Sequence, residues 1–364
     1  MMLLITFLFV CATALCASEG REISHPLYGS CLVAEPVLID LLESKALQRL
    51  RGINQYGVVH YTHKRYDYTR YDHSVGVFML LRRFDASLEE QIAGLLHDVS
   101  HTAFSHVADY LYCKPNTRGV LEVEKNGAAY QDDIFVAFLQ NTDVAEILAR
   151  HGISIDVINP HNGMCTMLEQ ELPDVCADRL EYTLFGAYRE NKLTQKDVEH
   201  ILASLTWQDG HWLFSDHHAA RLFADSSLYL TEHIFASAWN NAEYEWTACA
   251  LRYAIEHNLL SVDAFAQGTD DDLWCQLCAI QESVVKELVC TIASCTLDRC
   301  TTNSVPRRLI KSKFRGIDPL VIINGTVQRL SAYDARFYDC YHQLKNAIAA
   351  GSWIPDANAV ICRH

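Results

Sequence analysis

Apolar residues recur at intervals of three and four along most of the chain, a spacing that places them on one face of an α-helix. Residues 87–98 show it best, since Ser87 and two glutamates in the following turn are typical of a capped helix start. The spacing predicts further helices in residues 35–57, 73–84, 132–152, 176–188, 194–205 and most of 217–292. The chain is therefore expected to be mainly α.

Strand patterns are few. The best candidates are residues 211–214, HWLF, and residues 320–330, where Asn324-Gly325 inside LVIINGTVQRL predicts a hairpin turn. We find no internal repeat or long linker. The sequence predicts one helical domain over 21–300 and a small C-terminal α+β part over 301–364.

The N-terminus carries an apolar run over residues 3–17, followed by small residues and then polar sequence. The run is shorter than the roughly 20 residues that span a bilayer, so residues 1–20 resemble a signal peptide that directs export or secretion. No lysine or arginine precedes the run, as a signal peptide would usually have. An uncleaved anchor, or an extension on a cytoplasmic protein, is the alternative.

The charge balance argues against a protein that coats nucleic acid. The chain has 30 basic and 45 acidic residues, a net charge of −15. A local nucleic-acid contact stays open only at residues 307–315, which hold five basic residues, although such a run is usually a solvated face. The 14 cysteines show no compact disulfide spacing, which favours free thiols.

Residues 95–106, LLHDVSHTAFSH, place His97, Asp98, His101 and His106 in an otherwise apolar stretch. They form either a core segment with tolerated polar residues or the floor of a metal site. Neighbouring residues on a regular helix point about 100° apart, so His97 and Asp98 share one ion only if the helix bends or the ion lies between them.

Two other segments supply further metal ligands, namely His73 in TRYDHSVGV and Asp178 in ADRLEY. With His97 and Asp98 they make a set of two imidazoles and two carboxylates. Such a mixed set suits a divalent ion in a catalytic role better than a structural zinc. Mn, Fe, Ni, Zn and Mg all remain open.

The order of TRYDHSVGV, LLHDVSHTAFSH and DRLEY resembles the H…HD…D pattern of the HD-domain phosphohydrolases, specifically their deoxynucleoside triphosphate triphosphohydrolase-like branch. Residues 25–57 and 313–331 resemble the entry helices and the C-terminal part of that family. The likeness covers about residues 25 to 335 and implies a helical HD fold. It also implies a divalent metal, a nucleotide or small phosphoester as substrate, and assembly into homo-oligomers.

The resemblance also assigns roles to single residues. It implies that His73, His97, Asp98 and Asp178 bind the metal. It implies that His101, His106 and Asp109 lie beside the substrate phosphates and take part in catalysis. It implies that Gln55, Arg70 and Tyr182 bind the sugar and phosphate of the substrate. Arg179 is the other cation expected near the site.

The chain departs from the family pattern in the residues that assist catalysis and touch the sugar. A family HExxS motif is replaced near Tyr130 and Gln131, so its helper histidine is missing. Gly186 stands about where the family has an aspartate that touches the sugar.

A further departure concerns the basic helix that grips the triphosphate. The matching residues 238–257 have two asparagines and two glutamates, Glu243 and Glu245, before the first arginine. These carboxylates are expected to repel a triphosphate, unless residues 307–315 reach the site.

The sequence therefore predicts a metal-dependent phosphohydrolase that acts on a nucleotide or related phosphoester and hydrolyses dNTPs weakly. Two alternatives stay open: a catalytically weak nucleotide-binding regulator, and a metal-dependent nuclease or phosphodiesterase.

Overall fold

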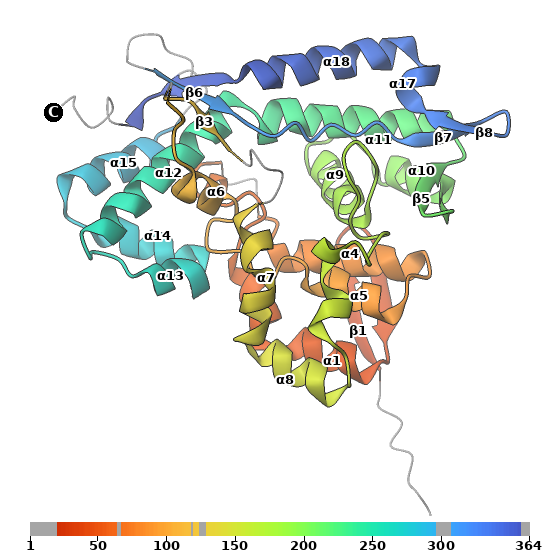
Figure 1. Ribbon diagram of the computed structural model, residues 1–364, viewed down its shortest axis with the longest axis horizontal. Helices are drawn as coiled ribbons and strands as arrows, with labels where there is room; N and C mark the ends of the chain where they lie inside the picture. The colour runs from red at the N-terminus through yellow and green to blue at the C-terminus, as the bar shows by residue number, and fades with distance from the viewer. Residues whose placement is uncertain (1–19, 64–66, 118, 124–128, 296–306, 358–364) are drawn as a thin grey trace, which may run out of the picture.

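The computed structural model describes residues 20–63, 67–117, 119–123, 129–295 and 307–357. Residues 1–19 lie outside this range, so the expected signal peptide falls almost wholly on residues that are not described. Within the described residues no helix is both long and apolar enough to cross a bilayer. Helices dominate the fold (Figure 1), which confirms the mainly α prediction.

The lower part of the molecule in Figure 1 is built from the N-terminal half of the chain. Helix α4 (Arg70–Arg83) packs against α5 (Leu88–Leu96) and α9 (Ala177–Arg189), and these three helices form its centre. The other helices of this half are α1 (Pro36–Glu43), α2 (Lys45–Arg49), α3 (Val59–Thr62), α6 (Val107–Tyr112), α7 (Tyr130–Gln140) and α8 (Asp143–Arg150).

The second half of the chain adds a helical layer above and beside this centre. Helix α11 (His217–Leu230) packs on α9, and after a π-helical turn (Thr231–Phe235) helix α12 (Ala238–Glu256) packs on α6. Figure 1 shows α18 (Ala335–Ala350) running above α11. The remaining helices are α10 (Gln195–Ser204), α13 (Val262–Gln267), α14 (Asp270–Ala279), α15 (Ser283–Ala293) and α17 (Leu330–Tyr333).

The described residues form three small sheets, two of which join distant segments. Strands β1 (Arg21–His25) and β2 (Gly29–Val33) form an antiparallel hairpin. The second sheet has the order β3-β6-β9, and the third has the order β4-β5-β7-β8. Their strands are β3 (Leu121–Glu122), β4 (Leu205–Gln208), β5 (His211–Phe214), β6 (Arg307–Lys311), β7 (Leu320–Ile323), β8 (Thr326–Arg329) and β9 (Ser352–Pro355).

The expected strands β5, β7 and β8 are confirmed, and the turn between β7 and β8 has positive φ at Asn324 and Gly325, as its sequence predicts. The C-terminal strands also pair with earlier ones, β6 with β3 and β7 with β5. The C-terminal part is thereby tied to the helical body on two sides. All ten cysteines within the described residues are free.

Local capping explains where helices begin and break. Thr69 and Asp72 form a reciprocal capping box that starts α4. The helix predicted over 35–57 is interrupted at Ser44, whose hydroxyl caps the separate helix α2. Ser87 caps α5 as expected, and α5 already ends at Leu96, so the following residues are free to turn.

A sharp turn follows α5, and Phe104 and Ser105 both adopt positive φ in it, at 60° and 53°. The turn lies in close contact with Gly57. A Cβ added at Gly57 would lie 2.4 Å from the carbonyl oxygen of Phe104. Gly57 itself has a φ of 53°, so both space and backbone conformation require glycine there.

Asp270, the first residue of α14, joins this turn to the segment that follows α2. Its carboxylate is buried and accepts hydrogen bonds from the backbone N–H groups of Asn54, at 2.8 Å, and Phe104, at 2.7 Å. It also accepts one from the Asn54 side-chain amide at 3.0 Å. Ser105 donates to the carbonyl of Asn54 at 2.6 Å, which closes the link.

Removing this carboxylate should destabilise the whole protein. We expect Asp270→Ala to lower the free energy of unfolding by about 2–4 kcal/mol, because two buried N–H groups lose their acceptor at about 1–3 kcal/mol each. Burial raises the pKa of Asp270 to about 6, so part of that loss is offset by removal of a costly buried charge. Urea unfolding measures the effect. Asp263→Ala, at an exposed position on α13, is the control and should change stability by no more than about 0.5 kcal/mol.

Candidate active site

A cleft of about 710 Å³ opens where α4, α9 and the turn after α5 meet. Four histidines line it, His97, His101, His106 and His161. The cleft collects all eleven residues that the sequence marks as metal-binding, catalytic or substrate-binding, nine of them on its wall and two directly behind it. Tyr182 and Arg179 of α9 lie on the wall, and His73 and Asp109 lie behind it.

The four expected metal ligands come together. Donor atoms of His73, His97 and Asp98 all lie within 4.8 Å of one another. The Oδ1 atom of Asp178 is 2.9 Å from His73 Nε2 and 3.6 Å from His97 Nε2, and the two Nε2 atoms are 3.2 Å apart. Four donor atoms from three separate segments therefore face one point.

In each of the two imidazoles, the hydrogen bond that Nδ1 donates fixes the tautomer. His97 Nδ1 donates to the carbonyl of Gly94 at 2.8 Å, and His73 Nδ1 donates to the carboxylate of Glu181. Both Nε2 atoms then carry lone pairs that face each other at 3.2 Å, which is repulsive unless a cation lies between them. This arrangement fits a bound divalent metal ion.

The electrostatics favour a cation at the same place. Burial opposes a charge on His73, yet Glu181, Asp178 and Asp98 together raise the pKa of His73 to about 10. The cluster therefore holds a positive charge, and a metal ion can take the place of that proton. Burial also opposes charge on Asp98, but Arg70 and the neighbouring histidines hold the pKa of Asp98 well below its usual value.

Arg70 and His101 both support Asp98. Arg70 donates to Asp98 Oδ2 at 2.8 Å and to the Ser105 hydroxyl at 2.9 Å, so its guanidinium is held by the turn described above. His101 Nε2 lies 3.2 Å from Asp98 Oδ1. Burial and the nearby Arg70 lower the pKa of His101 to about 3, so this imidazole is neutral.

His106 and Asp109 form a second pair on the same wall. His106 directly precedes α6, and its Nδ1 lies 2.9 Å from Asp109 Oδ2, three residues later on the helix. The other oxygen of Asp109 accepts the backbone N–H of Tyr130 at 2.7 Å. The carboxylate is thus anchored and orients an imidazole that is about a quarter exposed to the cleft.

A narrower pocket opens beside the polar cleft and shares Gln55, Arg70, His106 and Tyr182 with it. Its other walls are largely aromatic: Tyr56, Tyr110, Phe235 and Tyr244. The ring of Phe235 lies 5.7 Å from Tyr182, edge to face, and 6.3 Å from Tyr56 in a stacked orientation. Gln55, Arg70 and Tyr182 therefore stand at the junction of the two spaces.

Arg179 lies at the cleft, but its guanidinium already has partners. It donates to the carbonyl of Asp174 at 3.1 Å and lies 3.6 Å from the carboxylate of Glu169. Burial, then Asp178, raises the pKa of Glu169 to about 7, with Arg179 opposing the shift.

The expected repulsion from Glu243 and Glu245 is wrong. Both carboxylates are buried in α12 and lie outside the cleft and the aromatic pocket. Glu243 accepts a hydrogen bond from Thr62 at 2.8 Å, and Glu245 pairs with Arg308. The 3.6-residue repeat of α12 turns these side chains sideways and points Asn240 and Tyr244 into the pocket instead.

Sequence reasoning missed several residues that the fold brings to the cleft. Lys313 and Arg315 reach both spaces from the segment after β6, and only the basic run at 307–315 hinted at them. His161 reaches the cleft from a short 3₁₀ turn, with its Nε2 3.6 Å from Asp132 Oδ1. A lone histidine in a loop gives no sequence signal for this placement.

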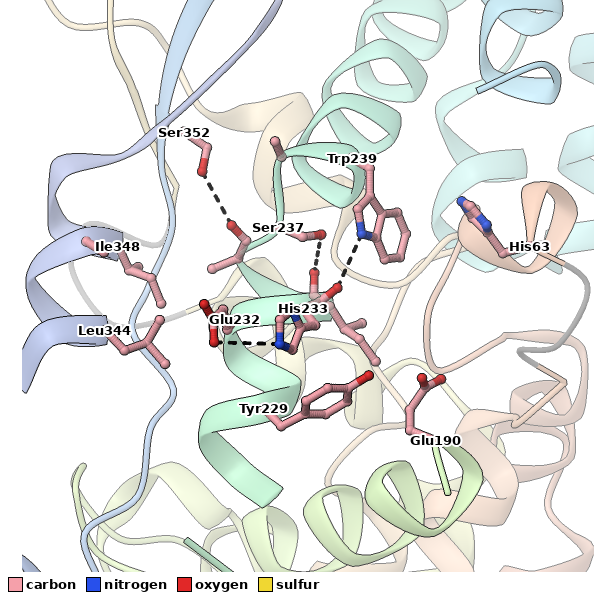
Figure 2. Close-up of a pocket in the computed structure, with 14 residues that line it drawn as sticks. His63, Glu190, Tyr229, Glu232, His233, Ser237, Trp239, Leu344, Ile348 and Ser352 are labelled. Carbon is pink, nitrogen blue, oxygen red and sulfur yellow. Dashed lines mark hydrogen bonds and ion pairs between the residues drawn. The ribbon is translucent and has the colours of Figure 1, made fainter. Parts of the chain in front are cut away.

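A larger pocket of about 1000 Å³ lies on another side of α12, between His63, Trp239 and α18 (Figure 2). Its titratable side chains are His63, Glu190, Tyr229, Glu232 and His233. No lysine or arginine is found among the described residues that line it. It lacks the cations that a phosphoester needs, so the smaller cleft is the candidate active site.

The chain is similar to several known proteins. The family model for the HD domain matches residues 70–183. Uncharacterized protein YdhJ of Bacillus subtilis is 34% identical over 273 residues, which cover 74% of this chain and 79% of that protein. The metal-dependent phosphohydrolase cns2 of Cordyceps militaris is 41% identical over 183 residues, half of each chain.

Other matches are more distant. The deoxynucleoside triphosphate triphosphohydrolase SAMHD1 of Bos taurus is 33% identical over only 104 residues, 24% of this chain and 18% of that protein. A solved phosphohydrolase from Bacteroides thetaiotaomicron shares the fold, with a TM-score of 0.66 at 15% identity over 92% of this chain and 98% of that one.

The fold and the ligand set together define a metal-dependent hydrolase of the HD class. This chain belongs to the HD-domain phosphohydrolase family, as its motifs lead one to expect. The identity of the metal ion is open.

Loss of a ligand should remove the metal. We expect His97→Ala and Asp98→Ala each to abolish bound metal, because each deletes a donor that faces the shared point. Metal analysis of the purified variants checks this. His257→Ala, an exposed histidine at the end of α12, is the matched control and should retain full metal content. Full occupancy in both ligand variants would show that the metal lies elsewhere.

Proposed function

We propose that the protein hydrolyses a phosphoester of a nucleotide-like substrate with a divalent metal ion. The observation that carries this proposal is the meeting of the four-ligand cluster, the His106–Asp109 pair and the aromatic pocket at one cleft. A planar ring would bind in the aromatic pocket, and the phosphate would lie at the junction with the polar cleft.

The residues around the junction support this orientation of the substrate. Gln55 and Asn240 offer amide groups beside the aromatic walls, which suits a base or sugar that forms hydrogen bonds. Arg70, Lys313 and Arg315 line both spaces and supply positive charge where they meet. An anionic group attached to an aromatic ring is complementary to this combination.

The bound metal would supply Lewis acidity toward the phosphoryl group and its attacking water. The protein groups do the rest. Asp109 holds His106 so that its imidazole faces the cleft and can pass a proton to or from a reacting oxygen. Arg70 keeps Asp98 ionised, and neutral His101 braces the same carboxylate from its other side.

The balance of charge in the cleft favours a substrate with one phosphate over a triphosphate. Six carboxylates line the polar cleft against four cations, and two of those cations, Arg70 and Arg179, already lie against carboxylates. The carboxylates are Asp98, Asp132, Asp133, Glu169, Glu171 and Asp178. A dipositive metal ion does not leave enough positive charge for a triphosphate, which needs several charge-assisted contacts.

The substrate class can be tested directly. We expect release of inorganic phosphate from nucleoside monophosphates with Mn²⁺, and weak or absent release of triphosphate from dNTPs. A screen of nucleoside mono-, di- and triphosphates and single-stranded nucleic acid, with products identified by chromatography, measures this. Efficient release of intact triphosphate would contradict the preference for one phosphate. Cleavage of nucleic acid would favour the nuclease alternative, and binding without turnover the regulatory one.

The role of the His–Asp pair has its own test. We expect His106→Ala to lower kcat about 10²–10⁴-fold, the usual contribution of a positioned proton-transfer group. Asp109→Asn should lower kcat less, because the amide still lies beside the ring but stabilises its charged form poorly. Metal content should be unchanged in both, since neither residue belongs to the ligand cluster. A kcat for His106→Ala within twofold of the parent would remove this histidine from the mechanism.

A further inference from the structure

The metal ligand His73 is held by a carboxylate that lies deep in the protein. Glu181 is on α9, three residues after Asp178, and is fully buried. Its Oε2 accepts hydrogen bonds from His73 Nδ1 and from the hydroxyl of Tyr68. Oε2 of Glu181 therefore links the metal ligand His73 to Tyr68. Tyr68 directly precedes Thr69, the residue that caps α4.

The other oxygen of Glu181 faces the N-terminal hairpin. His25, the last residue of β1, places its Nε2 3.6 Å from Glu181 Oε1, and both side chains are buried. The backbone N–H of Leu27 donates to His25 Nδ1 at 3.2 Å, so that nitrogen carries a lone pair. The proton of the neutral ring must then lie on Nε2, which points at the carboxylate.

Two further observations indicate that this contact is specific. Burial and the neighbouring His73 lower the pKa of His25 to about 3, which keeps its ring neutral. Within the described residues, His25 Nε2 and Glu181 Oε1 are both buried and neither has a hydrogen-bond partner, since the 3.6 Å between them is slightly longer than a hydrogen bond. Buried polar atoms are rarely left without a partner, so each of these two is the natural partner of the other.

The space around Glu181 is shaped for its carboxylate. An added Cβ at Gly76 of α4 would lie 2.6 Å from Glu181 Oε1, so any other residue would displace it. The His25 ring is held in place by Tyr28, stacked at 4.6 Å between ring centres, and by the edge of Phe185 at 5.3 Å.

We propose that the N-terminal hairpin is part of the metal centre: His25 and Tyr68 hold the Glu181 carboxylate, and Glu181 holds His73 with Nε2 turned toward the metal. This rests on the metal site of the proposed function. His25, Tyr68 and Glu181 are positioning residues, because none of them contacts the metal or the substrate. They act by fixing the tautomer and the orientation of one ligand.

The physical consequence concerns metal affinity first. A ligating imidazole whose N–H is held by a carboxylate is a better donor, and loss of such a partner typically weakens metal binding about 10–100-fold. Without its donors, the buried Glu181 carboxylate would take up a proton or shift away from His73.

Two buried tyrosines near this carboxylate, of which only Tyr68 donates to it, provide a matched experiment. Tyr68→Phe removes a hydroxyl that donates to Glu181, whereas Tyr28→Phe removes a buried hydroxyl with no hydrogen-bond partner in the described structure. Titration calorimetry of the metal-free full-length chain with Mn²⁺ should show about 10-fold weaker binding for Tyr68→Phe and less than a twofold change for Tyr28→Phe. Glu181→Gln should weaken binding about 10–100-fold.

The hairpin itself is tested by His25→Phe, which keeps an aromatic ring and removes the N–H. It should weaken Mn²⁺ binding while the variant remains folded, as judged by its metal-free thermal unfolding. Affinities of Tyr68→Phe, Glu181→Gln and His25→Phe within twofold of the parent would overturn the inference and leave the metal site standing. A parent protein that binds no Mn²⁺ or other divalent ion would instead overturn the proposed function on which the inference rests.

Discussion

Buried negative charge that requires a cation is the constraint on which this structure depends. Asp98 and Glu181 are buried in the helical interior, where an unpaired carboxylate is costly, and the partly exposed Asp178 lies beside them. The side chains of His73 and His97 stand among them with both Nε2 atoms turned inward. A divalent ion held by Asp98, Asp178 and the two histidines would satisfy these four groups at once, while Glu181 is paired with His73. The helices that carry them would then be stabilised by the same ion that the proposed function requires.

The elements around this cluster keep the ligands at fixed distances. Helix α5 ends before His97, and the turn that follows lets neighbouring residues face one point, which a continuous helix would prevent. Asp270 secures that turn from a helix more than 160 residues further along the chain. Arg70 then links the turn to the metal ligand Asp98 through Ser105. Stability and site geometry thus depend on the same hydrogen bonds.

Segments outside the motif helices complete the cleft and the aromatic pocket. The strand β6 pairs with β3 and β9, and the residues that follow it carry Lys313 and Arg315 over the cleft. The π-helical turn before α12 adds Phe235, and α12 adds Asn240 and Tyr244 to the aromatic pocket. The motif helices and the turn after α5 carry the metal-binding residues, whereas these later segments supply two cations and two aromatic side chains around the pocket.

The sequence by itself determined the helical class, the metal ligands as candidates, the His106–Asp109 spacing and the β7–β8 turn, because each depends on local periodicity or on a short motif. It did not determine which way the side chains of α12 point, and the expected effect of Glu243 and Glu245 was wrong for that reason. Nor could it place His161, Lys313 or His25 beside the cluster, since these residues come from separate loops and a hairpin. Their positions depend on long-range packing and on buried polar atoms that must find partners, and only the tertiary structure decides such contacts.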